Sequence, residues 1–217
     1  MNHNLIFHID VNSAYLSWTA VKMLEEGYGK DIREIPCIVG GDKQSRHGIV
    51  LAKSIPAKRY GIVTGEPVVN ALKKCPGLEM VPPEHDYYHV QSDRFIHVLR
   101  TYTPDLEQVS VDECYMDYSG ISNQFNSPIE AAVDIKDKIK KQLGFTVNIG
   151  ISDVKVLAKM ASDFMKPDRV HTLYRDEIQT KMWGLPVEDL FMAGKSSVMT
   201  LHKLGIFTIG QLAKSPV

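Results

Sequence analysis

The sequence predicts an α+β fold built on the ferredoxin-like, split β-α-β arrangement, with the element order βαββαβ. Short apolar runs indicate buried strands, and segments whose apolar residues recur every three or four positions indicate amphipathic helices. Stretches rich in Gly and Pro separate these elements. Residues 13–83 interrupt the series between its first strand and its first helix, and we interpret them as a small α/β insertion.

The first strand and the insertion are predicted from local signals. An apolar run over residues 5–9 ends at Asp10 and predicts a buried strand with a carboxylate at its C-terminal end. Helical spacing over residues 13–26 stops at Gly27, which favours a helix end there. Within the insertion, further strands are predicted at residues 36–39 and 48–52, and short helices at residues 57–60 and 68–74.

The remaining elements complete the series. Tyr88, Phe95 and Val98 share one apolar stripe of a long helix, and Ser127 supplies an N-cap for a second helix. In order, we predict a helix (84–103), two hairpin strands (106–111 and 114–118), a helix (128–143), a strand (145–151) and a helix (154–164). Because such a sheet carries helices on one face, we expect the other face to be open to a substrate.

The composition is that of an ordinary folded protein. The chain has 217 residues, of which 44% are hydrophobic and 24% charged, with 25 basic and 26 acidic side chains and a formal charge of −1. These values argue against disorder. No apolar run approaches the length of about 20 residues that a membrane span needs, and no secretory signal is visible. Three cysteines without metal-type spacing favour reduced thiols, so we expect a cytoplasmic protein with no membrane partner.

Charged residues are unevenly distributed along the chain. Between Asp42 and Glu66 every charged residue is basic, and no acid follows Asp189, whereas acids concentrate over residues 105–117. Patches of a single sign suit a surface that binds a polyanion. They predict phosphate groups near the basic segments and a cation near the acids. For either basic segment, the alternative is a solvent-facing stretch that lacks acids by chance.

Three carboxylates are candidates for one metal site. Asp10 ends the first strand, and Asp112 and Glu113 occupy the turn between two strands of the same predicted sheet. In the split β-α-β order the first strand lies beside this hairpin, so the three side chains can converge. Carboxylates this close repel one another unless a divalent cation holds them. Two Mg²⁺ ions about 4 Å apart would support phosphoryl transfer. The alternative is an ordinary Asp-Glu turn.

Several segments give the sequence a family resemblance. They are residues 8–15 (HIDVNSAY), 57–62 (AKRYGI), 110–117 (SVDECYMD), 150–152 (GIS), 157–163 (LAKMASD), 166–167 (KP) and 201–206 (LHKLGI). With them the chain resembles the Y-family, or lesion-bypass, DNA polymerases of the DinB-like DNA polymerase IV type. The resemblance is to their N-terminal catalytic core, the UmuC/ImpB-MucB-SamB family domain, and it extends over nearly the whole chain.

The resemblance implies template-directed, low-fidelity DNA synthesis past damaged bases. The implied partners are primer-template DNA and deoxynucleoside triphosphates. It implies that Asp10, Asp112 and Glu113 bind two Mg²⁺ ions together with the carbonyl of Val11, and that Asp112 and Glu113 are catalytic. Tyr15 corresponds to the family's steric gate, whose flat ring leaves no room for a ribose 2′-hydroxyl.

Nucleotide binding departs from the family pattern at two positions. Many relatives have a tyrosine and an arginine that contact the triphosphate where this chain has Ile55 and Lys58. Lys58 keeps the charge but cannot form a bidentate contact. Ile55 donates no hydrogen bond, so we expect Ser54 or Arg59 to compensate. Lys159 corresponds to the family's lysine at the incoming triphosphate.

The resemblance also implies a division into domains. Residues 1–13 and 84–168 would form the palm, 14–83 the fingers and 169–217 a helical thumb. In the thumb's helix-hairpin-helix, backbone N–H groups of Gly194, Lys195 and Ser196 would bind DNA at a primer phosphate, although Met192 replaces the usual first glycine. Relatives continue into a DNA-gripping domain, and many end in a sliding-clamp peptide. We therefore expect a truncated catalytic core without these parts.

Two other functions stay open at this point. A palm-type nucleotide cyclase shares the strand order and the paired carboxylates, but the insertion and the thumb hairpin have no role in it. A non-catalytic adaptor of the same family, which binds DNA or replication proteins, would typically lose the metal carboxylates, and this chain keeps all three. A DNA polymerase is therefore the leading hypothesis.

Overall fold

A five-stranded sheet forms the centre of the molecule. The computed structural model describes residues 5–41 and 48–216. The strand order is β5-β6-β1-β7-β8, and β1 runs antiparallel to both of its neighbours. The predicted α+β fold with the ferredoxin-like order is confirmed, and β8 extends it by pairing parallel to β7. The strands are β1 (Ile6–Val11), β5 (Leu106–Gln108), β6 (Glu113–Asp117), β7 (Val147–Ser152) and β8 (Val170–Thr172).

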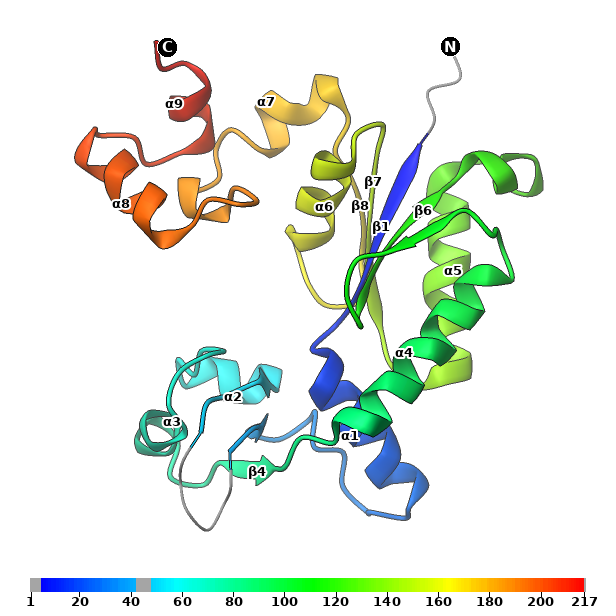
Figure 1. The fold of residues 1–217 in the computed structure, drawn as a ribbon, viewed down its shortest axis with the longest axis vertical. Helices are drawn as coiled ribbons and strands as arrows, with labels where there is room; N and C mark the ends of the chain where they lie inside the picture. The colour runs from blue at the N-terminus through cyan, green and yellow to red at the C-terminus, as the bar shows by residue number, and fades with distance from the viewer. Residues whose placement is uncertain (1–4, 42–47, 217) are drawn as a thin grey trace.

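The two faces of this sheet bury different side chains. Along β1, Phe7 and Ile9 are fully buried in the main core with helices α4 (His85–Arg100) and α5 (Pro128–Leu143). Because side chains alternate along a strand, His8 and Asp10 point to the opposite face, where helix α6 (Lys155–Asp163) lies. Figure 1 shows α4 and α5 on one side of the strands and α6 on the other. The expectation of one open face is therefore wrong for the part of the sheet that α6 covers.

Helix α6 approaches the sheet most closely at Gly150. A Cβ atom at this position would lie 2.0 Å from the carbonyl oxygen of Ala158 and 2.5 Å from the amide nitrogen of Ser162. Glycine is needed here because the helix backbone packs directly on the strand backbone. This contact fixes the position of Lys159, which lies on the same helix.

The insertion forms a second, three-stranded sheet with its own core. Its order is β3-β2-β4, and β4 runs parallel to β2. The strand predicted over residues 48–52 is shorter and lies later, and β4 was not predicted because three half-buried residues give no periodic signal. Lys43 and Arg46 of the predicted basic segment lie outside the described residues. The elements are β2 (Cys37–Val39), β3 (Ala52–Lys53), α2 (Ile55–Arg59), α3 (Val68–Lys74) and β4 (Glu79–Val81).

Helix α1 (Ala14–Glu25) belongs to both parts of the molecule. Its Trp18 and Val21 pack into the main core, whereas Leu16 and Ala20 pack against residues of the insertion. The helix is buried on two sides because each part covers one of its faces. The expected boundary between palm and fingers, between residues 13 and 14, assigns α1 to the fingers alone. The helix nevertheless packs into the main core as well.

The C-terminal segment is helical and packs against α6. Met160 of α6 shares a small core with Leu173 and Ile209. Strand β8 lies in the segment expected to be the thumb but pairs with the large sheet, so the helical part begins after Thr172. Its helices are α7 (Ile178–Lys181), α8 (Lys195–Lys203) and α9 (Ile209–Ala213), and 3₁₀ turns occupy Ser119–Gln124, Arg175–Glu177 and Val187–Asp189. Over the residues described, no helix has the length and apolar character to cross a bilayer.

The packing at Gly150 leads to a stability prediction. Gly150→Ala would force α6 away from β7 and should lower the free energy of unfolding by about 3 kcal/mol, measured by urea denaturation. Gly77→Ala is the matched control, because its Cβ would meet nothing within 4 Å, and it should change stability by less than about 0.5 kcal/mol. Equal stability of the two variants would contradict the close approach.

Candidate functional site

A cavity of about 870 Å³ lies between the large sheet and the insertion. The end of β1 and the start of α1 line one side of it, and residues of β3 and α2 line the other. Of the predicted site residues, the cavity is lined by Asp10, Val11, Tyr15, Ser54, Lys58 and Asp112. The predicted residues that do not line it are Arg59, Glu113, Lys159, Gly194, Lys195 and Ser196.

Strand pairing places the predicted carboxylates side by side along the backbone. Asp10 on β1 lies directly opposite Glu113 on β6 in the antiparallel register. The amide of Val11 donates to the carbonyl oxygen of Asp112 over 3.0 Å, which fixes the tip of the hairpin beside the end of β1. Glu113 is the first residue of β6 and is not a turn residue. Residues about a hundred positions apart thus meet at one edge of the site.

Two lysines neutralise the buried carboxylate of Asp10. The ammonium of Lys166 donates to Asp10 Oδ1 and to Asp163 Oδ1, each over 2.9 Å. Lys159 donates to Glu113 and lies 3.5 Å from Asp10 Oδ2. Burial raises the pKa of Asp10, while the charges of Lys166 and Lys159 act in the opposite direction. Burial lowers the pKa of Lys159, but its acidic neighbours outweigh this and raise the pKa to about 12.

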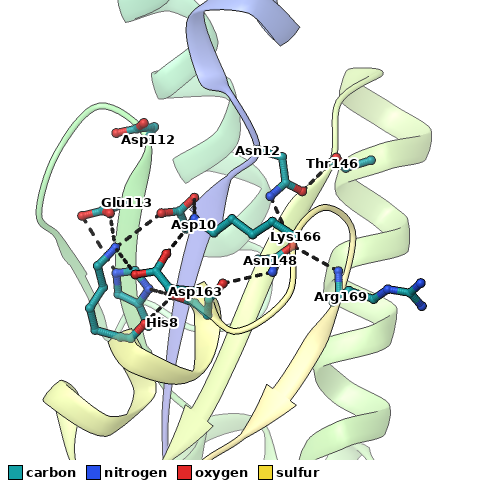
Figure 2. Close-up of polar contacts among 12 residues, drawn as sticks. His8, Asp10, Asn12, Asp112, Glu113, Thr146, Asn148, Asp163, Lys166 and Arg169 are labelled. Atoms are coloured by element: carbon teal, nitrogen blue, oxygen red, sulfur yellow. Dashed lines mark hydrogen bonds and ion pairs between the residues drawn. The ribbon is translucent and has the colours of Figure 1, made fainter. Parts of the chain in front are cut away.

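The carboxylate of Asp112 lies apart from the other two. Its Oδ1 accepts a hydrogen bond from Ser110 Oγ (2.7 Å), and Figure 2 shows it away from Asp10. Within residues 5–41 and 48–216, no three His, Cys, Asp or Glu side chains are arranged to hold a metal ion. Carboxylate oxygens at one cavity are nevertheless the ligands that a hard divalent cation prefers. These carboxylates are therefore of the chemical type that binds such a cation, although lysines pair with Asp10 and Glu113 in this structure.

His8 lies beneath the carboxylates as a neutral side chain. Ser162 Oγ donates to the carbonyl oxygen of Lys159 (2.8 Å), so His8 Nδ1 is the donor in its 2.8 Å hydrogen bond to Ser162 Oγ. Burial and the nearby charge of Lys159 lower the pKa of His8 to about 4. The other ring nitrogen lies 4.0 Å from Glu113 and has no hydrogen-bond partner among the described residues. His8 therefore adds no positive charge to the site at neutral pH.

The ring of Tyr15 is fixed at the cavity wall. It stacks on Tyr88 with a centroid distance of 4.4 Å and an interplanar angle of 12°, and His85 meets it edge-on at 5.8 Å. The hydroxyl of Thr19 donates to the carbonyl oxygen of Tyr15 (2.8 Å) and so accepts the hydrogen bond from the Tyr88 hydroxyl (2.8 Å). Stacking of this kind contributes about 0.5–1.5 kcal/mol beyond burial. Such a ring forms a rigid barrier on one side of the cavity.

Two of the predicted nucleotide-binding residues are placed differently from expectation. Ser54 is buried, and its hydroxyl donates to the carbonyl oxygen of Ile35 (2.6 Å) while it accepts from the amides of Cys37 and Ala57. Ser54 therefore caps α2 and has no donor left for a ligand. Arg59 is exposed and does not line the cavity. These contacts give no support to the prediction that one of the two compensates for Ile55, which stays a prediction.

Lys166 lines the cavity, whereas Lys159 does not. The side chain of Lys159 is directed at Glu113, on the face of the sheet that α6 covers. Lys166 reaches the cavity from the loop after α6, where it also contacts Asp10. This position of Lys166 is not predicted by the sequence because a loop lysine carries no periodic signal. The only signal was the Lys-Pro pair within the family segments.

Two buried amide side chains hold the loop that carries Lys166 (Figure 2). Asn12 Nδ2 donates to Asn148 Oδ1 over 3.2 Å. Asn12 Oδ1 accepts from the amide of Asp168 (2.9 Å), and Asn148 Nδ2 donates to the carbonyl oxygen of Met165 (2.7 Å). Both ends of the loop are thereby tied to β1 and β7. Neither asparagine was predicted, because their contacts depend on the pairing of distant strands.

The predicted DNA-binding residues lie at the start of α8, away from the cavity. Gly194 is the N-cap residue, and no side chain caps the helix in the part of the chain described. The amides of Lys195 and Ser196 therefore keep their donors available to an anion. Met192 has a φ of 72° and is 86% exposed. The hairpin thus forms with methionine in a backbone conformation that favours glycine.

Comparison with known proteins identifies relatives of the chain. Residues 9–163 match the impB/mucB/samB family. DNA polymerase IV of Clostridium acetobutylicum is 54% identical over 213 residues, which are 98% of this chain and 54% of that protein. DNA polymerase IV of Alkaliphilus oremlandii is 40% identical over 209 residues, 96% of this chain and 51% of that protein.

The fold is also found in a solved structure. The crystal structure of DinB from Sulfolobus solfataricus matches with a TM-score of 0.82 at 23% identity, covering 98% of this chain and 60% of that one. The chain spans about half the length of the curated relatives it matches. The matched family covers most of the sequence, and the relatives extend the match to nearly all of it. The chain therefore belongs to the impB/mucB/samB family.

Proposed function

We propose that this chain is the catalytic core of a template-directed DNA polymerase that copies past damaged bases. The observation that carries the proposal is the cavity in which Asp10 and Asp112 of the large-sheet part face lysines of the insertion. Phosphoryl transfer needs acidic groups where the attacking oxygen is activated and cationic groups at the phosphates. Both kinds of group line this one cavity, and the relatives are named DNA polymerase IV.

In this proposal the parts of the fold have separate tasks. The large sheet acts as the palm, the insertion as the fingers and the helices after Thr172 as the thumb. Primer-template DNA is the partner of the palm and thumb, with the amides at Gly194, Lys195 and Ser196 at a primer phosphate. A sliding clamp is proposed as a further partner of the whole protein. Because the relatives are bacterial and the proposed substrate is DNA, we place its action in the cytoplasm.

The proposed cofactor is a pair of Mg²⁺ ions. Asp10, Asp112 and Glu113, with the carbonyl oxygen of Val11, would hold them. At these residues, Mg²⁺ would supply the Lewis-acid chemistry of phosphoryl transfer, which activates an attacking oxygen and stabilises a leaving one. The ammonium of Lys159 lies against the carboxylates of both Glu113 and Asp10 and offsets part of their negative charge.

The remaining residues orient the nucleotide. We assign the sugar to the Tyr15 side of the cavity, where the ring stacked on Tyr88 would exclude a 2′-hydroxyl. Lys58 and Lys166 line the cavity and are assigned to the phosphates. In this proposal Lys166 has the role at the triphosphate that the family resemblance implies for Lys159. Its contact with Asp10 links the phosphate side of the site to the carboxylates.

The carboxylates are tested by substitution. Asp112→Ala and Glu113→Ala should each lower the rate of template-directed primer extension with Mg²⁺ by at least about a hundredfold, since loss of even an outer-shell partner costs about 10–100-fold. Asp93→Ala is the matched control because Asp93 is an exposed acid on α4, and it should leave the rate unchanged.

Other outcomes of the same assay would favour the alternatives. Cyclic nucleotide formation without template would indicate a nucleotide cyclase. DNA binding by a well-folded protein without any incorporation would indicate an adaptor. Either result would overturn the proposed function.

Sugar selection is tested at Tyr15. Tyr15→Ala removes the ring at the cavity wall and should lower the preference for deoxynucleotides over ribonucleotides by about tenfold or more, measured as the ratio of kcat/KM values for single insertions. Tyr15→Phe keeps the ring and should keep the preference. An unchanged ratio in Tyr15→Ala would show that another group selects the sugar.

A further inference from the structure

Two of the cations that line the cavity form no ion pair within residues 5–41 and 48–216. The basic side chains that line it are Arg33, Lys53, Lys58, Lys140 and Lys166. Three of these are in ion pairs: Arg33 with Asp31 (2.7 Å), Lys140 with Asp168 (2.8 Å) and Lys166 with Asp10 (2.9 Å). Lys53 and Lys58 form no ion pair with any residue of the described chain. Both belong to the same face of the insertion, one at the end of β3 and the other on α2.

Lys53 is directed into the cavity by the local structure. Its neighbour Ala52 packs into the core between α1 and the insertion, so strand alternation turns Lys53 the other way. The ammonium donates to the hydroxyl of Thr64 over 3.0 Å, and Thr64 also lines the cavity. Burial lowers the pKa of Lys53, and the charge of Lys58 lowers it further. Two like charges held together in this way are stabilised when an anion binds between them.

The residues next to Lys53 cannot supply the same contact. Ile55 lines the cavity but has no hydrogen-bond donor. The hydroxyl of Ser54 is committed to the cap of α2, and Arg59 does not line the cavity. Of the residues from Lys53 to Arg59, only Lys53 and Lys58 therefore present a charged donor to the cavity.

We propose that Lys53 is a nucleotide-binding residue, which forms with Lys58 a cationic pair for the triphosphate of the incoming nucleotide. This assignment rests on the proposed function and adds a second fingers cation to it. Lys53 supplies a charged contact beside Ile55, where no other side chain donates. The two lysines line the same cavity as Asp10 and Asp112. The triphosphate would thus lie between a cationic wall and the carboxylates that hold the metal.

The binding test uses inorganic tripolyphosphate, which has the charge of the nucleotide's phosphates but cannot be polymerised. Titration calorimetry of the 217-residue chain should give a dissociation constant about tenfold higher for Lys53→Met, because a charge-assisted contact is lost. Lys53→Arg keeps the charge and should bind like the unmodified protein. Lys73→Met removes an exposed lysine of α3 outside the cavity and should also bind like it.

A kinetic measurement separates this role from a structural one. Lys53→Met should raise KM for the incoming deoxynucleotide about tenfold with kcat changed less than about twofold, and Lys53→Arg should restore KM. Unchanged tripolyphosphate affinity in Lys53→Met, or no binding by the unmodified chain, would overturn the assignment. If Lys53→Met loses binding but the unmodified chain incorporates no nucleotide, the anion site stands and the polymerase proposal fails.

Discussion

The site depends on pairing one buried carboxylate, that of Asp10, with two lysines. Asp10 is 7% exposed, and an unpaired charge at that depth would be strongly destabilising. Lys159 and Lys166 contact Asp10 from two directions and compensate its charge. Lys159 lies on α6 and Lys166 on the loop that follows it. The helix can carry Lys159 to Asp10 only because Gly150 lets it lie directly on β7. The close packing at Gly150, which involves no charged group, thus determines that Lys159 lies beside Asp10.

Several polar groups behind Asp10 are committed to hydrogen bonds within the scaffold. His8 is neutral and bonded to Ser162, so it adds no charge next to Lys159. The side chains of Asn12 and Asn148 form hydrogen bonds with the loop that carries Lys166. Buried polar networks of this kind specify one arrangement, because each member is costly if left unpaired. Lys53 and Lys58, which line the cavity, take no part in this network.

The insertion contributes charge of the opposite sign. The large sheet brings Asp10 and Asp112 to the cavity, whereas the insertion brings Lys53 and Lys58, which form no ion pair with any described residue. Helix α1 joins these two parts because its side chains pack into both cores. A phosphate-bearing ligand with a divalent cation complements both walls at once. This complementarity, together with family membership, is what supports nucleotidyl transfer over the other functions.

The sequence by itself predicted the fold class, most of the elements and the candidate metal carboxylates, because apolar periodicity, caps and motif spacing are local properties. The helices at residues 68–74 and 128–143 were predicted with the bounds observed. Only the tertiary structure decided which lysine reaches the cavity, that Ser54 caps a helix, and that β8 joins the large sheet. These outcomes depend on contacts between distant segments and on competition for each hydrogen-bonding group. A single stretch of sequence records neither.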